Sequence, residues 1–288
     1  MAVKFFGQFL VEQGAVTSEA LLHAIELQER TNLKLGEMAV AMGYITADDI
    51  ERAHTSQLSK DMKLGDLLVD LGILTPSQLQ EVIHRQKATH LYIGEALVKV
   101  GALTPEKLES YLAAFKVDQA PYVADRIELP DWLANQQLWE TTVDMTYKMI
   151  TRVLGIQFRP GKCQEVSRLS TNHMLAAMDL SGDAAARYLL SVSAGLQKTI
   201  AKAVLREDNV DQEPPEVLED TVMEFVNIVC GNVVAKASQS GLSLEINPPI
   251  TIHPALNGLP VPDSYRALLF PIHVSDDEVL ELALFIKL

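Results

Sequence analysis

The chain has 288 residues and a formal net charge of −14 at pH 7, from 24 Lys and Arg against 38 Asp and Glu. Its length fits two domains, and its 48% hydrophobic and 22% charged residues are typical of a folded globular protein rather than a disordered one. The acidic excess disfavours general binding to nucleic acids. The sequence has no apolar run of the roughly 18 residues that a membrane span needs, and its start makes a poor signal peptide. We therefore expect a cytoplasmic protein.

Residues 1–116 contain four copies of a 29-residue pattern. Each copy has a glycine, a second glycine seven residues later, a threonine three residues after that, and a glutamine fourteen residues after the second glycine; Phe115 stands at the glutamine position of the fourth copy. The other positions, copy by copy, are Gly7, Gly14, Thr17 and Gln28; Gly36, Gly43, Thr46 and Gln57; Gly65, Gly72, Thr75 and Gln86; and Gly94, Gly101 and Thr104. Repeats of this length usually form one supersecondary unit, and we expect each copy to stack on the next.

The third copy indicates how each copy folds. The leucines of KLGDLLVDLG follow helical spacing, and Gly72 ends this short helix, as glycine commonly does where a positive φ is needed. Thr75 is a good N-cap residue, with Pro76 at the first position of the second helix and Gln78 at the third. Each copy is therefore predicted to be a short helix, a turn and a longer helix, and the simplest interpretation is an all-α scaffold of four helical hairpins.

The repeat pattern resembles the MshEN domain, which is found at the N-termini of bacterial type II secretion and type IV pilus ATPases. In that family, paired copies separated by five residues bind cyclic di-GMP. The run from Lys34 to Gln57, the spacer LSKDM and the run from Lys63 to Gln86 match this tandem layout. The ligand-binding positions that the resemblance implies are Lys34, Leu35, Gly36, Gly43, Gln57, Lys63, Leu64, Gly65, Gly72 and Gln86.

The arginine that begins the family motif is absent from all four copies. Its position is occupied by Phe5, Lys34, Lys63 and Tyr92. An arginine can stack on guanine and bond a phosphate through two N–H groups, whereas a lysine offers only a point charge. Two interpretations therefore stay open: a cyclic di-GMP site on the two inner copies, and a scaffold that has lost this ligand.

The segment 117–136 has two prolines and no helical period, which predicts a linker to a second domain at 137–288. Asp131 can cap the helix that follows, and Gly155 ends that helix. Further along the chain we expect a strand at IQFRPG, two strands joined by a hairpin at Ser181-Gly182-Asp183, a helix at GLQKTIAKAVL, a long helix from about Glu216 to Ser238, and three strands in the tail. The predicted fold class is α+β overall, with an all-α first domain and an α/β second domain whose sheet is mostly antiparallel.

The long helix carries the candidate catalytic residues. Glu224 and Asn227, at i and i+3, share one face with Asp220 and Gly231. A carboxylate and a carboxamide placed in this way can engage one partner together, and the missing side chain at Gly231 lets that partner approach. From spacing alone, the simpler interpretation is a solvated helix face.

The run EFVNIVCGN, from Glu224 to Asn232, resembles the Glu-x-x-Asn helix of the CheC/CheX/FliY chemotaxis phosphatases. From about Gln137 onward, the order of elements is similar to that of CheX, including the LSGD hairpin. The resemblance implies a phosphatase that acts on the phospho-aspartate of a CheY-like response regulator in two-component signalling. It also implies that Asn227 orients the attacking water and that Glu224 pairs with a lysine of the regulator. Mg²⁺ then belongs to the regulator, and this chain holds no metal or other cofactor.

Alternatives to this enzyme stay open. A non-catalytic adaptor that docks motility, pilus or secretion components, with cyclic di-GMP as a ligand of the repeats, is the main one. CheX-like domains commonly dimerise through their sheets, so a homodimer is also open. The second helices of the repeats lack a basic face, which argues against DNA binding.

Cysteines and histidines give no sign of a metal site. Cys163 and Cys230 have apolar neighbours and no metal-ligand spacing, so we expect buried free thiols. His173, His253 and His273 have no Cys or Asp close by in the pattern that metal ligands show, and we expect them to pack or to face water.

Overall fold

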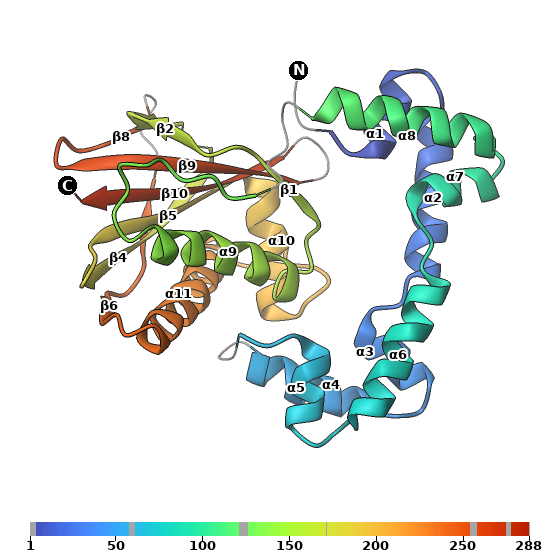
Figure 1. Ribbon diagram of the computed structural model, residues 1–288, viewed down its shortest axis with the longest axis horizontal. Helices are drawn as coiled ribbons and strands as arrows, with labels where there is room; N and C mark the ends of the chain where they lie inside the picture. The colour runs from blue at the N-terminus through green and yellow to red at the C-terminus, as the bar shows by residue number, and fades with distance from the viewer. Residues whose placement is uncertain are drawn as a thin grey trace. The chain divides into compact units, whose positions relative to one another are not determined.

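The computed structural model describes residues 4–57, 61–120, 126–170, 172–253, 258–274 and 278–287 (Figure 1). The chain divides into two compact units, residues 1–121 and 122–288. The first unit contains the helices α1 to α8, and the second contains α9 to α11 together with the strands β1 to β10. The predicted α+β fold class is confirmed.

Each repeat copy forms a short helix, a turn and a longer helix. The helices, in chain order, are α1 (Phe6–Glu12), α2 (Ser18–Thr31), α3 (Leu35–Ala41), α4 (Ala47–Gln57), α5 (Leu64–Asp70), α6 (Pro76–Thr89), α7 (Ile93–Lys99) and α8 (Pro105–Gln119). The second glycine of each copy ends the short helix with a positive φ, +72° at Gly43 and +68° at Gly72. The hydroxyls of Thr17, Thr75 and Thr104 accept hydrogen bonds from the main-chain N–H groups three residues on, as N-cap residues do.

The copies pair as one with four and two with three, and each pair has its own hydrophobic core. We call copies one and four the outer lobe and copies two and three the inner lobe. In the outer lobe α2 packs on α7, and in the inner lobe α3 packs on α6 and α4 on α5. The expected stacking of each copy on the next is therefore wrong for copies one and four. The physical reason is a cluster of three aromatic rings, since Phe115 of copy four lies 5.2 Å from Phe6 and 5.3 Å from Phe9 of copy one.

The chain crosses between the two lobes twice, and the two crossing segments are bonded to each other. Asn32 Nδ2 donates to the main-chain oxygen of Leu91 at 2.9 Å, and the Leu91 N–H donates to Asn32 Oδ1 at 2.7 Å. One side chain thus makes both hydrogen bonds that a neighbouring β-strand would make. The crossing is held by this pair of bonds.

An antiparallel sheet forms the centre of the second unit. Its strands are β1 (Phe158–Pro160), β2 (Gln164–Val166), β4 (Met174–Gly182), β5 (Ala186–Val192), β6 (Leu244–Ile246), β7 (Ile250–Ile252), β9 (Tyr265–Val274) and β10 (Val279–Lys287). They run in the order β1-β9-β10-β5-β4-β6, with β2 also paired to β9 and β7 to β4. A separate pair is formed by β3 (Arg168–Leu169) and β8 (Leu259–Pro260). The hairpin predicted at residues 181–183 joins β4 to β5.

The tail of the chain differs from the three predicted strands. The first of them is divided into β6 and β7. Pro248 and Pro249 lie between the two pieces, and a proline has no N–H to donate to a sheet ladder. The edge of the sheet beside β4 therefore consists of two short strands rather than one long one.

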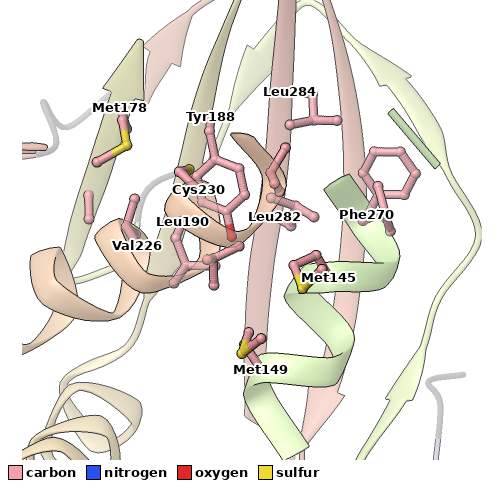
Figure 2. Packing of buried hydrophobic residues seen from close by; sticks show 14 of the residues in the cluster. Met145, Met149, Met178, Tyr188, Leu190, Val226, Cys230, Phe270, Leu282 and Leu284 are labelled. Carbon is pink, nitrogen blue, oxygen red and sulfur yellow. The ribbon is translucent and has the colours of Figure 1, made fainter. Parts of the chain in front are cut away.

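Three helices cover one face of the sheet: α9 (Gln136–Arg152), α10 (Ala194–Leu205) and α11 (Pro215–Gln239). Figure 2 shows Met145 and Met149 of α9 and Val226 and Cys230 of α11 gathered around the inner side of the sheet, where Tyr188 of β5 is fully buried. The opposite face carries a smaller apolar cluster on β4, β5, β9 and β10. The long helix is thus fixed on the sheet by its apolar side, which leaves its other side free.

Both cysteines are free thiols, Cys230 buried and Cys163 partly buried. Burial raises the pKa of Cys163 to about 11 and raises that of Cys230 further. Neither thiol is therefore ionised near neutral pH, and both act as small apolar side chains.

The predicted linker at 117–136 is too long at its start. Helix α8 continues to Gln119. The side chain of Gln119 is buried, and its Oε1 accepts a hydrogen bond of 2.8 Å from the Lys4 N–H, which ties the end of α8 to the beginning of copy one. Residues 121–125 of the predicted linker lie outside the described part of the chain.

The end of the predicted linker belongs to the second unit. Leu133 is buried in its core, and the Arg266 guanidinium lies 3.7 Å from the ring centroid of Trp132. Helix α9 does not begin with Asp131 as its cap. Its N-cap residue is Asn135, whose φ of 52° lies in the left-handed region, which asparagine tolerates better than most residues.

One carboxyl group on the outer face of the sheet is partly buried and lacks a hydrogen-bond partner for one of its oxygens among the described residues. Glu281 of β10 faces Ser191 of β5, and its Oε1 accepts a hydrogen bond of 3.5 Å from Ser170. Among the described residues, nothing hydrogen-bonds to Glu281 Oε2 or to the Ser191 hydroxyl, both of which are buried. Burial raises the pKa of Glu281.

We therefore expect Glu281→Gln to stabilise the protein. The folded-state pKa of Glu281 is above its unfolded value, so the associated stability is full below the unfolded pKa and is lost as the pH rises through the folded pKa. Glutamine carries no charge to bury. Thermal unfolding followed by circular dichroism should show a higher melting temperature for the variant at about pH 7 and a smaller difference at about pH 4. Glu245→Gln, at the exposed position of β6, is the matched control, and an equal gain there would contradict the explanation by burial.

Candidate functional site

The long helix α11 buries one side and exposes the other. Its fully buried residues include Val222, Phe225, Val226, Val229 and Val233. The opposite side carries a line of exposed residues three or four positions apart, which we call the exposed line of α11: Glu216, Asp220, Glu224, Asn227, Gly231 and Ala235. Prolines 214 and 215 fix the start of the helix, where a missing N–H costs nothing. The apolar period of the sequence thus sets which side chains face solvent.

Glu224 and Asn227 lie next to each other at the middle of this line. Asn227 Nδ2 is 3.4 Å from Glu224 Oε2, a long and weak hydrogen bond. Among the described residues, no other hydrogen bond or ion pair engages either side chain. A carboxylate oxygen and an amide oxygen are therefore available to bind a cation and a water molecule of a partner.

The flanks of the exposed line are fixed by contacts to the sheet edge. The Thr251 hydroxyl of β7 is 3.3 Å from Met223 Sδ, and His253 Nε2 is 3.8 Å from Glu219 Oε1. Asn232 is buried, and its Nδ2 donates to the main-chain oxygen of Ile228 at 2.8 Å. Asn232, the last residue of the EFVNIVCGN run, thus supports the helix from inside rather than joining the exposed pair.

Gly231 is exposed in the interior of a 25-residue helix. A Cβ atom built at this position would meet nothing within 4 Å in the part of the chain that the structure describes. Glycine at an exposed position inside a helix destabilises it by about 1 kcal/mol relative to alanine. The fold of this chain therefore gains nothing from the glycine.

The histidines set aside in the sequence are dispersed. His173 and His253 are exposed, and His273 is half-buried, which lowers its pKa. In the described part of the chain, no group of three or more His, Cys, Asp or Glu side chains could hold a metal ion. Nor does any helix there have the length and apolar character to cross a membrane.

The first glycine of each repeat lets the two helices of that copy pack closely. A Cβ atom at Gly36 would lie 2.9 Å from the Ile50 side chain, and one at Gly65 would lie 2.5 Å from that of Leu79. Both distances are shorter than real Cβ contacts, and the other two copies repeat this arrangement. Together with the positive φ of the second glycine, this contact means that folding alone accounts for both glycine positions of the pattern.

The repeat glutamines bind the two copies of a lobe to each other. Gln57 Nε2 donates to the main-chain oxygen of Met62 at 2.9 Å, and Gln86 Nε2 donates to that of Leu33 at 3.0 Å. Each acceptor precedes the Lys-Leu-Gly run of the paired copy. Gln57 is buried. The amide N–H groups of these two predicted ligand residues are therefore already engaged within the inner lobe.

The outer lobe repeats this arrangement with one substitution. Gln28 Nε2 donates to the main-chain oxygen of Leu91 at 3.0 Å. In copy four, Phe115 fills the core instead of bonding, and Gln119, one turn further on, bonds to Lys4 in its place. The sequence pattern does not predict this contact role, because three of the four bonded pairs, all except Gln57 and Met62, are more than 50 residues apart in the chain.

The two lysines of the predicted ligand set lie at the surface of the inner lobe. Lys34 and Lys63 are exposed and immediately precede α3 and α5. Their segments touch, since the Leu35 side chain would lie 3.3 Å from a Cβ atom at Gly65. Leu64 is half-buried against the inner-lobe core. Residues 58–60 of the spacer LSKDM lie outside the described residues.

Comparison with known proteins bears on the second unit. The model of the family described as Chemotaxis phosphatase CheX matches residues 174–273, a range that includes all of α11 with Glu224 and Asn227. The second unit is CheX-like. No curated protein matches the chain as a relative.

Several solved structures are similar to the CheX-like unit. CheX from Desulfovibrio desulfuricans is 18% identical, with a TM-score of 0.45 over 52% of this chain and 99% of that chain. A CheX-CheY-BeF3-Mg²⁺ complex from Borrelia burgdorferi gives 20% identity, a TM-score of 0.46, and 52% and 98% coverage. A CheC-like superfamily protein from Shewanella sp. PV-4 gives 16% identity, a TM-score of 0.46, and 53% and 99% coverage. All three are remote in sequence.

Proposed function

We propose that this protein removes the phosphoryl group from the phospho-aspartate of a CheY-like response regulator. The observation that carries the proposal is the exposed pair Glu224 and Asn227 on α11, inside the range that matches the CheX family model. An acyl phosphate is already reactive, so its hydrolysis needs positioning and electrostatic complementarity rather than a covalent intermediate on the enzyme. Two polar side chains held in position by a firmly packed helix are therefore sufficient for this reaction.

Each of the two residues has one role in the proposed reaction. Asn227 holds a water molecule through its carboxamide, in line with the bond between phosphorus and the aspartyl oxygen. The water oxygen attacks phosphorus, the aspartyl carboxylate leaves, and inorganic phosphate is released. Glu224 pairs with a lysine of the regulator and so fixes the register of docking. The Mg²⁺ that neutralises charge on the phosphoryl oxygens is part of the regulator.

The test is the lifetime of phosphorylated receiver domains. A panel of purified receivers is phosphorylated with a small-molecule donor, and phosphate release is timed with and without the full chain at substoichiometric concentration. We expect release from at least one receiver to be accelerated with turnover. An unchanged lifetime across the panel, which must include every receiver encoded by the source genome, would refute the proposal.

We also propose the inner lobe as a cyclic di-GMP site that regulates the enzyme or docks an adaptor. This second proposal is supported by Lys34 and Lys63, which are both exposed and begin segments in contact through Leu35 and Gly65. Two ammonium groups can neutralise two phosphates, although each gives a point charge rather than a bidentate contact. The engaged amides of Gln57 and Gln86 limit what else the site can offer.

Calorimetric titration with cyclic di-GMP at low salt tests this site. We expect saturable binding by the full chain and a loss of about tenfold or more in affinity in the double variant Lys34→Ala/Lys63→Ala. Lys107→Ala/Lys116→Ala, on exposed positions of α8, removes the same charge from the outer lobe and should bind as the wild type does. If the wild type gives no saturable signal, the cyclic di-GMP site is refuted, and the interpretation of the repeats as a scaffold remains.

A further inference from the structure

The exposed line of α11 changes character along its length. Its first half carries three carboxylates, Glu216, Asp220 and Glu224. Beyond Asn227 it has the bare backbone of Gly231 and the methyl group of Ala235, before the exposed polar residues Ser238 and Gln239 at the end of the helix. A partner that lies along this helix thus meets negative charge before Asn227 and nearly uncovered main chain in the two turns directly after it.

Gly231 differs from the other helix-associated glycines of the chain. Gly65 is required by the Leu79 side chain that packs on it, and Gly72 by its positive φ of +68°. Gly231 lies within an ordinary helix, does not have a positive φ, and has open space where its Cβ would be. Neither packing nor backbone conformation within this chain requires a glycine there.

The neighbouring functional residue supplies a reason. Asparagine has a short side chain, so the Asn227 carboxamide can reach a phosphoryl group in another protein only if the helix surface itself lies against that protein. Gly231 is one helical turn away on the same line, about 6 Å along the axis. A side chain at that position would stand between the two surfaces and hold them apart.

We propose that Gly231 is a docking position at which the phosphorylated receiver domain packs directly on the main chain of α11, so that Asn227 can reach the phosphoryl group. This inference rests on the proposed function. The three carboxylates of the first half of the line select a receiver surface with basic residues, through charge complementarity. Gly231 sets how closely the receiver approaches, and the acidic end sets its orientation.

Two substitutions at Gly231 test the inference. Gly231→Ala should raise the melting temperature by about 2–4 °C, because the helix loses a poor helix former, while affinity for a receiver activated with beryllofluoride falls about tenfold. Gly231→Gln should weaken binding further, in keeping with its larger side chain. Thr199→Ala, at an exposed position of α10, also improves helix propensity and should stabilise the protein without any change in affinity.

The outcomes separate this inference from the proposed function. Suppose that the wild type binds activated receivers and that the affinity of Gly231→Gln is within about twofold of the wild-type value. The docking role of Gly231 is then wrong, and the enzyme assignment is unaffected. If the wild type binds receivers and Gly231 substitutions weaken binding, but phosphate release is not accelerated, the docking role stands and the phosphatase activity does not. Binding to no receiver at all overturns both.

Discussion

The Asn227→Ala variant is expected to lose about 100-fold or more of the acceleration of phosphate release at saturating receiver concentration. Asn227 is exposed on α11, and its only described hydrogen bond, to Glu224, is 3.4 Å long, so its removal leaves the fold intact. What is lost is the group that orients the water in the proposed mechanism. The measurement is single-turnover phosphate release, compared with affinity for a receiver activated with beryllofluoride, which should change by less than about tenfold.

Gln239→Ala is the matched control for this variant. Gln239 presents an exposed carboxamide on the same helix, twelve residues from Asn227 and therefore about 18 Å away along its axis. Its removal should leave both release and affinity unchanged. Full activity in Asn227→Ala would show that the water is oriented by another group and would remove the basis of the proposed mechanism.

Reversal of charge at Glu224 is the second change with a large expected effect. Glu224→Lys should raise the KM for the phosphorylated receiver by about 100-fold. In the proposed complex a lysine then faces the lysine of the receiver, and like charges at an interface cost several kcal/mol. The rate at saturation should fall far less than in Asn227→Ala. The affinity of the wild type should fall with added salt, whereas that of the variant should not.

A charge swap makes this prediction specific. Changing the receiver's lysine to glutamate should restore much of the affinity for Glu224→Lys and weaken that for the wild type. Glu207→Lys, at an exposed position after α10, makes the same change in net charge and should leave KM within about twofold of the wild type. If both lysine variants raise KM equally, the effect is one of total charge, and Glu224 does not pair with a specific residue.

The elements that could be predicted from sequence are those fixed by local patterns. Helix α11 and the hairpin of β4 and β5 appear where the apolar period and a Ser-Gly-Asp turn predict them. The cap of α9 is Asn135 rather than the predicted Asp131, because nothing in the sequence shows that Asn135 takes a positive φ. The division of β6 from β7 differs from the single predicted strand, and Pro248 and Pro249 are the sequence signal for it.

Long-range pairing is what the sequence leaves undetermined. Four similar copies can pair in several ways, and the contacts that decide among them, such as Phe6 with Phe115, join residues more than one hundred positions apart. The bonds from Gln57 and Gln86 to main-chain oxygens of the paired copy likewise depend on how the copies pair, and the ligand role of these glutamines stays a prediction. The exposure of Glu224 and Asn227 on α11 is easier to predict from sequence, because the buried residues of one helix determine which of its sides faces solvent.

The pairing of copy one with copy four has a consequence for the order of folding. The inner lobe lies entirely between Asn32 and Leu91 in the chain, and its glutamine bonds join residues 5 positions apart, Gln57 and Met62, and 53 positions apart, Gln86 and Leu33. The outer lobe must close a much longer loop, since Lys4 bonds to Gln119. Loop closure costs more entropy as the loop lengthens, and a folded inner lobe shortens the effective loop. We therefore expect copies two and three to form first and to bring the two ends of the repeat unit together.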